Sequence, residues 1–409
     1  MVSVAVIGGG AAGMMAALEA ASRGAAVDLY ERQARVGRKL SVTGNGRCNL
    51  SNLHASAEHY HGEEAGFPEE ALLRYGTAET LKHFRDMGLL TVAEEDGRIY
   101  PLSNTAGSVV DVLRYALEAS GVRVNTGFEV ERIQKAERGF LLVTEGEKRF
   151  ADRVIVACGG LAGERFGGSR LGYRLLEWLG HSTTPLREGL VQLRSDNGCC
   201  RSLKGIRADA AVRVFGRGGF LGSSAGEVQF TDYGLSGPAI FEVSRPALSE
   251  PETTVSLDLI RRTPEETLVE LLLARCRTTP LLLTEDIFVG TVQNRIGRVL
   301  VNAAGLDPRK PLSRLKREEA VLLAHGAKHF LFRITGNLGM ENAQVTVGGI
   351  RTGEFDPLTL ESRLCPGLFA CGEVLDVDGD CGGFNLQWAW SSGRLAGAFA
   401  AEKSDASDS

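Results

Sequence analysis

The hydrophobic positions near the N-terminus fall into three blocks. Residues 2–7 (VSVAVI) form a continuous apolar run rich in β-branched residues, which predicts a buried strand. Glycines follow at once, and the small apolar sequence MMAALEAASR then predicts a helix that ends before Gly24. A second apolar run, residues 25–30 (AAVDLY), predicts a strand leading to Glu31. The expected order is therefore strand, tight turn, helix and strand.

Apolar segments of the same kind return later in the chain. Residues 152–160 (DRVIVACGG) and 368–373 (LFACGE) each predict a strand followed by a turn. After the second of these, small and apolar residues recur with helical spacing, which predicts a helix suited to packing on a sheet. Its expected buried face consists of Leu386, Ala389, Trp390, Gly393, Gly397 and Ala400.

The middle of the chain has a different pattern. Between residues 188 and 262, short strands such as AAVRVFG, EVQFTD and TTVSLDLI are broken by glycine and proline. Residues 264–325 have helical spacing and begin with Pro264 and acidic residues, which are favourable in the first turn of a helix. Residues 329–336 (HFLFRITG) predict one further strand.

Composition limits the class of protein. The 409 residues exceed one ordinary hydrophobic core, and 43% hydrophobic with 24% charged residues is typical of a globular protein with two or three domains. No apolar run approaches the roughly 18 residues of a membrane span, and the N-terminus has no signal-peptide pattern. The eight cysteines include no CxxC pair, and His325 and His329 lack an intervening Glu. We therefore expect a reduced, cytoplasmic protein with no metal, no membrane contact, and both histidines on an ordinary helix face.

The N-terminal turn contains a dinucleotide-binding fingerprint. Gly8, Gly10 and Gly13 give G-x-G-x-x-G between the first predicted strand and helix. Gly8 allows the tight turn, Gly10 lets the backbone approach a pyrophosphate, and Gly13 lets the helix pack closely on the strand. The N–H groups and dipole of the helix attract the phosphates. Glu31, at the end of the second strand, can accept hydrogen bonds from a ribose diol.

The C-terminal segment indicates which dinucleotide is bound. Glu373 ends a predicted strand and could bond a polyol hydroxyl, and the helix N-terminus near 385–387 could direct its dipole at an anionic ring edge. FAD has a ribitol and a ring that becomes anionic on reduction, whereas NAD has neither. No second strand–GxGxxG–helix unit is present in the sequence. The prediction is one tightly and noncovalently bound FAD, with NAD(P)H binding transiently as reductant.

Seven motifs then occur in an order typical of one bacterial family. They are VIGGGAAGMMAA, GRKLSVTGNGRCNLSN, YPLSNTAGSVVDVL, VACGG, FTDYGLSGPAIF, VTVGGI and GEVLDVDGDCGGFNLQWAWSSGRLAG. Over nearly its whole length the chain resembles the BaiN/RdsA-like flavoproteins, also called NAD(FAD)-utilising dehydrogenases or the aminoacetone oxidase family. The resemblance implies an α/β fold with a discontinuous, Rossmann-like FAD domain of the two-dinucleotide-binding type. Into it are inserted a β-barrel-like domain and, within that, a helical subdomain.

This plan assigns the segments of the chain to domains. The FAD-binding domain is expected over residues 1–187 and 346–409. The β-barrel-like substrate domain is expected over residues 188–262 and 329–345, and the helical subdomain over residues 263–328.

The resemblance also implies a set of flavin-binding residues. The segment 38–49 resembles the family's flavin-embracing loop; its glycine backbones and amide side chains suit the hydrogen-bonding edge of a flavin, and Lys39 or Arg47 suits the phosphates. The complete expected set is Gly8, Gly10, Ala11, Ala12, Gly13, Glu31, Arg32, Arg38, Lys39, Asn45, Gly46, Arg47, Cys48, Asn49, Val130, Ala157, Gly159, Gly160, Gly372, Glu373, Asp376, Gly383, Phe384, Asn385, Leu386 and Gln387.

Cys48 raises a separate question. Related disulfide reductases have a CxxxxC pair in the comparable region, whereas Cys48 has no second cysteine within reach along the segment. A dithiol relay is therefore not expected. We interpret Cys48 as a packing or flavin-lining residue, with proton donation to the substrate as the alternative.

The resemblance implies three activities: reduction of a conjugated C=C in oxo-bile acids, reduction of uridine in ribosomal RNA to dihydrouridine, and oxidation of aminoacetone by O₂. The first two share hydride transfer to the β-carbon of an α,β-unsaturated carbonyl and protonation of the α-carbon. We favour this ene-type reduction; a flavin oxidase of a small amine and a non-catalytic, flavin-binding or redox-sensing protein are the alternatives. Candidate proton donors are Tyr233, Tyr100 and Cys48, and a packed ring is the alternative for each tyrosine.

Two basic stretches bear on the choice of substrate. Residues 295–317 hold seven Arg or Lys against one Asp, and residues 187–217 hold seven against three acidic residues, in a chain of net charge −5. Positive charge in the inserted part is what steering of an RNA backbone requires. A solvated helix face is the alternative, so both ribosomal RNA and a small-molecule substrate are open.

Overall fold

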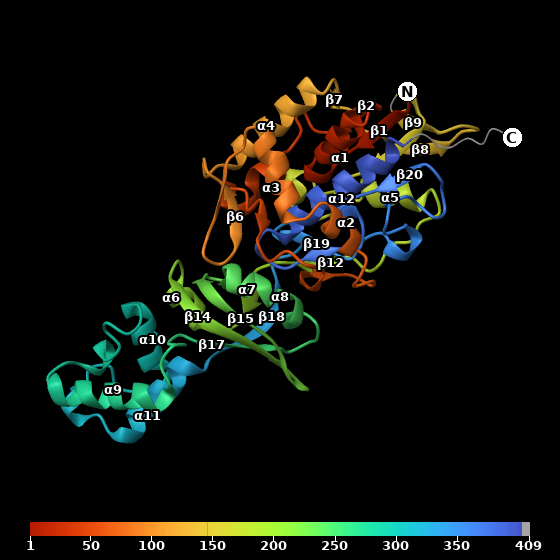
Figure 1. The fold of residues 1–409 in the computed structure, drawn as a ribbon. Coiled ribbons are helices and arrows are strands. Elements are labelled where there is room, and N and C mark those ends of the chain that lie inside the picture. The colour runs from red at the N-terminus through yellow and green to blue at the C-terminus, as the bar shows by residue number, and fades with distance from the viewer. Residues whose placement is uncertain (145, 403–409) are drawn as a thin grey trace. The chain divides into compact units, whose positions relative to one another are not determined.

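The computed structural model describes residues 1–144 and 146–402, and the end of the predicted FAD domain, residues 403–409, lies outside the described part. Figure 1 shows the order of the elements along the chain. None of the described helices combines the length and hydrophobicity needed to cross a membrane.

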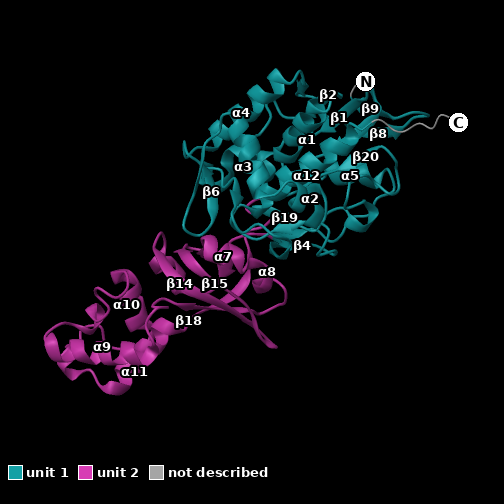
Figure 2. Cartoon of the chain, in the orientation of Figure 1, with its two compact units in different colours: residues 1–188, 343–409 teal, residues 189–342 magenta. Residues whose placement is uncertain are grey.

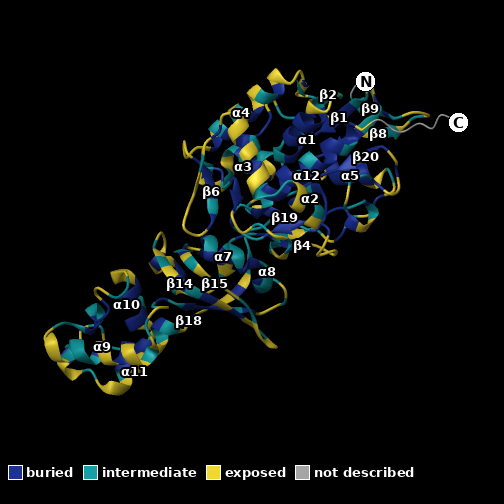
Figure 3. Ribbon diagram, viewed as in Figure 1, coloured by how far each residue is buried: buried dark blue, intermediate teal, exposed yellow. Residues whose placement is uncertain are grey.

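The chain divides into two compact units (Figure 2). Unit 1 comprises residues 1–188 and 343–409, and unit 2 comprises residues 189–342. The expected boundaries at 187/188 and 345/346 lie one and three residues from these divisions. Each unit has its own hydrophobic core (Figure 3).

A parallel sheet of five strands, in the order β20-β11-β1-β2-β7, forms the centre of unit 1. Its central strands are buried on both faces, which explains why the sequence shows continuous apolar runs rather than alternation. The C-terminal strand β20 pairs with β11, so the two separated parts of the chain complete one sheet. The strands are β1 (Ser3–Ile7), β2 (Ala26–Glu31), β7 (Arg123–Thr126), β11 (Arg153–Val156) and β20 (Leu368–Ala370).

Smaller antiparallel sheets complete the strands of unit 1. One contains β8 (Arg132–Lys135), β9 (Phe140–Thr144) and β10 (Glu147–Ala151). Another contains β3 (Ser51–Asn52), β5 (Thr91–Ala93) and β6 (Arg98–Pro101). Two strand pairs are β4 (Tyr60–His61) with β21 (Asp378–Gly379), and β12 (Arg187–Gly189) with β19 (Val345–Val347).

The helices of unit 1 include one unexpected packing partner. The small face of the C-terminal helix α12 packs mainly on helix α1, and the helix also contacts β11 and β20 of the parallel sheet, as expected from its sequence. A Cβ on Gly393 would lie 2.5 Å from the carbonyl oxygen of Ala12, so only glycine permits this approach of the two backbones. The helices are α1 (Ala11–Ser22), α2 (Glu69–Arg74), α3 (Thr77–Asp86), α4 (Ala106–Ala119), α5 (Leu171–Glu177) and α12 (Phe384–Ala400).

Unit 2 contains a closed barrel with the strand order β13-β16-β15-β14-β17-β18. Alternate residues point into it: Phe330, Phe332 and Ile334 of the last strand are buried, as the period of two in HFLFRITG requires. The strands are β13 (Leu193–Ser195), β14 (Arg207–Gly216), β15 (Gly219–Phe230), β16 (Gly234–Ser236), β17 (Thr254–Asp258) and β18 (Phe330–Asn337).

The helices of unit 2 share the barrel's hydrophobic core. Leu268, Ile296 and Leu323 belong to the same buried cluster as the inward-facing strand residues. The predicted helical subdomain, residues 263–328, falls within unit 2. The first long helix begins directly after Pro264, as predicted. The helices are α6 (Cys199–Leu203), α7 (Pro238–Glu242), α8 (Ser244–Ala247), α9 (Glu265–Thr278), α10 (Asn294–Ala303) and α11 (Arg317–Lys328).

Candidate active site

Four groups of predicted cofactor residues lie at the ends of strands of the parallel sheet in unit 1. Residues 8–13 follow β1, Glu31 ends β2, residues 157–160 follow β11, and residues 372–373 follow β20. The carboxyl ends of parallel strands meet at one edge of a sheet, where open α/β folds bind their ligands. Four segments that are far apart in the sequence therefore converge on one place.

The turn after β1 is tightly constrained. Gly8 has φ +111°, and a Cβ there would collide with the carbonyl oxygen of Ala157. A Cβ on Gly13 would collide with the carbonyl oxygen of Gly8, which explains the third glycine of the fingerprint. Sterics therefore require glycine at both positions.

The space before helix α1 is open. Gly10 is the N-cap residue and no side chain caps the helix, so the first-turn N–H groups of Ala11, Ala12 and Gly13 have no side-chain acceptor there. A Cβ on Gly10 or on Gly159 would meet no atom within 4 Å. An uncapped helix N-terminus with glycine walls fits a pyrophosphate, because the N–H groups and helix dipole both favour negative charge.

Glu31 keeps acceptor capacity beside this space. Its Oε2 accepts the N–H of Gly9 and its Oε1 accepts the N–H of Gln33, each at 2.7 Å. An ionised carboxylate has about four acceptor positions, so positions are left for a ribose diol. The neighbouring Arg32 donates to the carbonyl oxygen of Gly167 at 2.9 Å and thereby holds a loop.

The loop at 38–49 owes its composition to left-handed backbone. Gly44, Asn45, Gly46 and Cys48 all have positive φ, between +57° and +83°. Glycine and asparagine adopt this conformation with least strain, so the sequence TGNG builds the loop whether or not its side chains contact a ligand.

The basic residues of this loop have protein partners. Lys39 Nζ forms an ion pair with Glu373 Oε2 at 2.8 Å, which ties the loop to the end of β20. Arg47 pairs with Glu94 at 2.7 Å and lies over the ring of Tyr100, 3.9 Å from the ring centre. Arg38 is exposed. Lys39 retains N–H groups for a cofactor phosphate, since an ammonium group has three donors.

Of the roles predicted for Cys48, packing fits the structure best. The residue is fully buried, and burial raises the pKa of its thiol to about 12. Burial therefore favours the packing interpretation, and the flavin-lining and proton-donor roles stay predictions.

The two tyrosines predicted as proton donors differ in position. Tyr100 is 7% exposed and lies beneath Arg47, and burial raises its pKa, so it fits the packed-ring alternative. Tyr233 belongs to unit 2, where its carbonyl oxygen accepts the N–H of Ser195. A catalytic role for Tyr233 stays a prediction.

The N-terminus of α12 lies beside an unsatisfied acceptor. Asn49 Oδ1 is buried and has no hydrogen-bond partner among the described residues. A Cβ on Gly383 would lie 2.8 Å from this oxygen, so the predicted flavin loop and the start of α12 adjoin. A buried acceptor without a partner is costly unless a ligand supplies a donor, and the N–H of a flavin ring is a donor of this kind.

Three other predicted residues in unit 1 are buried. Gln387 is fully buried, with its amide bonded to Ser51 and Thr80. Asp376 is 4% exposed and Val130 is 1% exposed. The remaining predicted cofactor residues lie at strand ends, as Gly160 and Gly372 do, or in the first turn of α12, as Phe384, Asn385 and Leu386 do.

These observations together fit FAD. The uncapped start of α1 suits the pyrophosphate, and Glu31 suits the ribose. Lys39 and Glu373 suit the region between the phosphate and the ribitol. The oxygen of Asn49 suits an N–H donor of the flavin ring.

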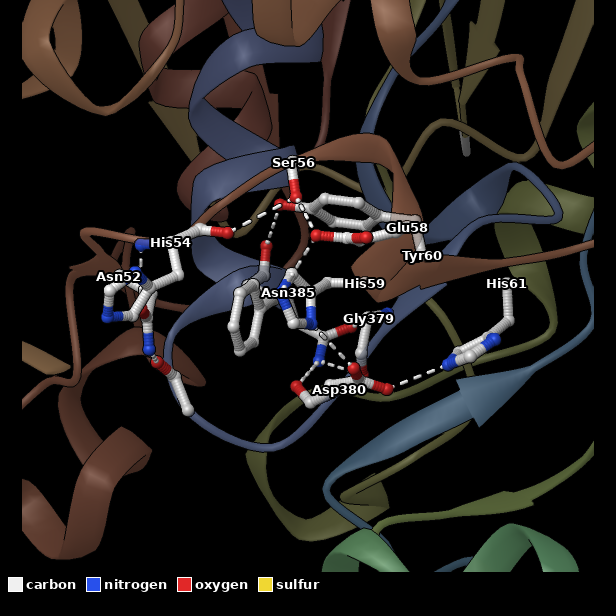
Figure 4. Close-up of polar contacts among 12 residues, drawn as sticks. Asn52, His54, Ser56, Glu58, His59, Tyr60, His61, Gly379, Asp380 and Asn385 are labelled. Atoms are coloured by element: carbon white, nitrogen blue, oxygen red, sulfur yellow. Dashed lines mark hydrogen bonds and ion pairs between the residues drawn. The ribbon is translucent and has the colours of Figure 1, made fainter. Parts of the chain in front are cut away.

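One polar cluster in unit 1 was missed by sequence reasoning. Asp380 lies between His59 and His61, with His59 Nδ1 2.9 Å from Oδ2 and His61 Nε2 2.7 Å from Oδ1 (Figure 4). The only local signal was the pair of histidines two residues apart in EHYH, since alternate residues of an extended segment share a face. Nothing in the sequence linked them to Asp380.

Acidic residues in unit 2 offset the basic stretches. In residues 187–217, Lys204, Arg207 and Arg217 each form an ion pair, with Asp232, Glu227 and Glu252 respectively. In residues 295–317, Arg298, Lys310 and Arg317 pair with Asp286, Glu319 and Glu270 respectively. The local excess of positive charge is therefore smaller in space than along the sequence.

His325 lies on α11, and His329 is the C-cap residue that follows its last turn. Both lie close to Glu265 at the start of α9, and His325 Nδ1 is 3.2 Å from Glu265 Oε1. Among the described residues this is the one group of three that could hold a metal ion, with all ligand atoms within 4.8 Å. His325 is within hydrogen-bonding distance of the carboxylate, whereas His329 Nε2 lies 3.6 Å from Glu265 Oε2.

Comparison with known proteins identifies the class. A family model described as the HI0933-like protein Rossmann domain matches residues 2–399. The 3-dehydro-bile acid delta(4,6)-reductase of Clostridium scindens is 38% identical over 406 residues, covering 98% of this chain and 99% of that protein. The ribosomal RNA dihydrouridine synthase of Escherichia coli is 30% identical over 392 residues, covering 95% of each.

A solved structure shows the same fold at low identity. The 3-ketosteroid delta1-dehydrogenase of Sterolibacterium denitrificans has a TM-score of 0.50 at 14% identity, covering 98% of this chain and 100% of that chain. Fold and site thus define a flavoprotein oxidoreductase with a Rossmann-type FAD domain. The chain belongs to the HI0933-like family, which confirms the resemblance found in the sequence.

Proposed function

We propose that the protein is an NAD(P)H-linked, FAD-dependent reductase of the conjugated C=C in a small enone such as an oxo-steroid. The observation that carries this proposal is the similarity over nearly the whole chain, at 38% identity, to a protein named as a bile acid delta(4,6)-reductase. The site agrees with it, because the strand ends of unit 1 provide places for each part of FAD. The free thiols of all eight cysteines suit a reducing compartment, and we propose the cytoplasm.

The residues of unit 1 would divide the work of binding. The first-turn N–H groups of α1 would hold the pyrophosphate and Glu31 the adenosine ribose, while Lys39 and Glu373 would hold the next part of the cofactor. Asn49 would accept a hydrogen bond from the ring and fix its orientation. When bound, FAD supplies hydride transfer between a nicotinamide and the substrate.

A small substrate is favoured over RNA by the charges of unit 2. Three basic residues of each basic stretch are ion-paired within the unit, so fewer are left to neutralise phosphates. Reduction of uridine in ribosomal RNA is the second candidate, because a 30% identical relative is named as a ribosomal RNA dihydrouridine synthase.

The test begins with the cofactor and continues with the substrate. Acid precipitation of the purified protein should release FAD; release of FMN, or of no flavin from folded protein, would contradict the proposal. Anaerobic mixing with NADH or NADPH should bleach the bound flavin, and a 3-dehydro-Δ4,6 bile acid should restore its colour. Reoxidation by ribosomal RNA with formation of dihydrouridine would favour the second candidate, and turnover of aminoacetone with O₂ alone would favour an oxidase.

A further inference from the structure

The cluster around Asp380 has a fixed backbone. Strands β4 and β21 pair in antiparallel register, and the Asp380 N–H donates to the carbonyl oxygen of His59 at 3.0 Å. The side chain of Asn385 closes the loop, accepting from the Gly379 N–H at 2.8 Å and donating to the Gly379 carbonyl oxygen at 2.7 Å. The carboxylate is thereby held where both imidazoles can reach it (Figure 4).

The position of the cluster connects it to the cofactor site. Asp380 lies in the loop that leads into α12, and the ring of His59 stacks on Phe384 with centres 4.4 Å apart. Phe384 is the first residue of that helix, next to Gly383 and the unpartnered oxygen of Asn49. The imidazole of His59 therefore lies beside the segment expected to contact the flavin ring, and Asp380 links it to the imidazole of His61.

The two histidines use different nitrogens. His59 presents Nδ1 to Asp380, and its Nε2 is 3.9 Å from Glu58 Oε1, so carboxylates face both sides of this ring. His61 presents Nε2 to Asp380, which leaves Nδ1 for another partner, and its side chain is 38% exposed. Of the two rings, His61 is the more exposed and has a nitrogen that no carboxylate faces within ion-pairing distance among the described residues.

The carboxylate is suited to hold His61 in one orientation. Burial by itself would raise the pKa of Asp380, but hydrogen bonds from His61 and His59 hold it below the usual range. An ionised Asp380 keeps the Nε2–H of His61 directed at itself in both protonation states. The proton that His61 can release is then the one on Nδ1, as in other carboxylate–histidine pairs.

We propose that His61 is the proton donor of the reduction, with Asp380 as its positioning residue, an inference that rests on the proposed function. As hydride reaches the β-carbon of the enone, the C=C electron pair shifts toward the carbonyl. The Nδ1–H bond of the imidazolium breaks, its electrons stay on the ring, and a C–H bond forms at the α-carbon. Neutral His61 keeps Nε2–H on Asp380 and regains a proton from water, while the nicotinamide supplies the hydride electrons through the cofactor.

The main variant is His61→Gln, which retains an N–H for Asp380 but has no titratable proton. His54→Gln is the matched control, because His54 is exposed on the same segment and its imidazole has no carboxylate within ion-pairing distance in the described structure. With FAD-loaded, nicotinamide-reduced protein, reoxidation by a 3-dehydro-Δ4,6 bile acid should be at least ~100-fold slower in His61→Gln, in the range of general acid catalysis. The control should reoxidise like wild type.

Two further readouts separate proton donation from a structural role. The wild-type reoxidation rate should fall as pH rises through the titration of an imidazole, and the rate in His61→Gln should lack this step. In Asp380→Asn the reoxidation rate should also fall, because the neutral amide no longer holds the Nε2–H of His61 as the carboxylate does.

The outcomes distinguish the two proposals. An unchanged reoxidation rate in His61→Gln, with wild type active, would overturn the donor role and leave the enone reductase standing. If wild-type protein is bleached by nicotinamide but is reoxidised by no enone, the proposed function fails and the donor role fails with it. If His61→Gln does not retain FAD, Asp380→Asn serves instead, and a reoxidation rate equal to wild type in that variant would overturn the positioning role.

Discussion

Glu31→Ala tests the dinucleotide site most directly, because one carboxylate has two roles there. Its oxygens accept the N–H groups of Gly9 and Gln33 at 2.7 Å and keep positions for a ribose diol. A hydrogen bond to a charged group contributes about 1.5–3 kcal/mol. Loss of a single ribose contact therefore predicts FAD binding weaker by about 10- to 150-fold. The protein without FAD should also lose stability, since two backbone donors lose their acceptor.

The assay separates the two effects. Titration of cofactor-free protein with FAD, followed by flavin fluorescence, gives the dissociation constant, and urea unfolding without FAD gives the free energy of unfolding. Asp28→Asn on the same strand is the matched control, because Asp28 pairs with the exposed Arg123. A surface pair of this kind is worth about 0–1 kcal/mol, so this variant should bind FAD like wild type.

The result that would refute the reasoning is specific. If Glu31→Ala loses stability but binds FAD as tightly as wild type, the carboxylate only braces the turn and does not face a ribose. Glu31→Gln should lie between the two, because its single amide oxygen replaces two carboxylate oxygens.

Three further predictions follow from the buried and charged groups. Cys48→Ser should keep FAD and should lower the free energy of unfolding by about 1–3 kcal/mol through burial of a hydroxyl. Neither wild type nor the variant should have disulfide reductase activity; such an activity in wild type that the variant lacks would contradict this. Replacing Arg314, Lys316 and Arg317 together with Glu should leave enone reduction unchanged, and loss of the gene should leave the dihydrouridine content of ribosomal RNA unchanged by mass spectrometry; a fall in that content would identify RNA as substrate. The pKa of Asp380 is lower in the folded protein than the ordinary carboxyl value of about 3.9, so its stabilisation is present above that value and is lost as pH falls through the folded pKa. The free energy of unfolding of Asp380→Asn should therefore depend less on pH in that acid range than that of wild type. The same pH dependence in both proteins would contradict the assignment.

The cofactor half-site was predictable because its information is local. The fingerprint of β1, the turn and α1 lies within 20 consecutive residues, and the glycines are required by close backbone approaches that hold in any protein with this turn. The barrel strands were likewise visible through their alternation, as in Phe330, Phe332 and Ile334. Family membership followed from the order of several such local motifs.

Side-chain roles were less predictable, because partners far away in the chain decide them. Arg47 carries a charge suited to phosphate, but Glu94 and Tyr100 hold it instead. The small face of α12 has the composition of a helix on a sheet, yet Gly393 is small because α1 passes there. In the basic stretches, sequence counts missed the acidic partners contributed by other strands and helices of unit 2.

The proposed proton donor, His61, depends on information that is distant in the sequence. Two-residue strands have no hydrophobic period, so neither β4 nor β21 could be predicted, and Asp380 and His61 are 319 residues apart. The imidazole–carboxylate pair exists only because these short strands adopt one antiparallel register, and a slip of one residue would turn Asp380 away from both histidines. Under the proposed mechanism, cofactor binding depends on the fingerprint, whereas protonation depends on this register. Substitutions at His61 or Asp380 can therefore alter the chemistry of the substrate while the FAD site stays intact, which is why reoxidation, and not FAD content, is the decisive measurement for the reaction.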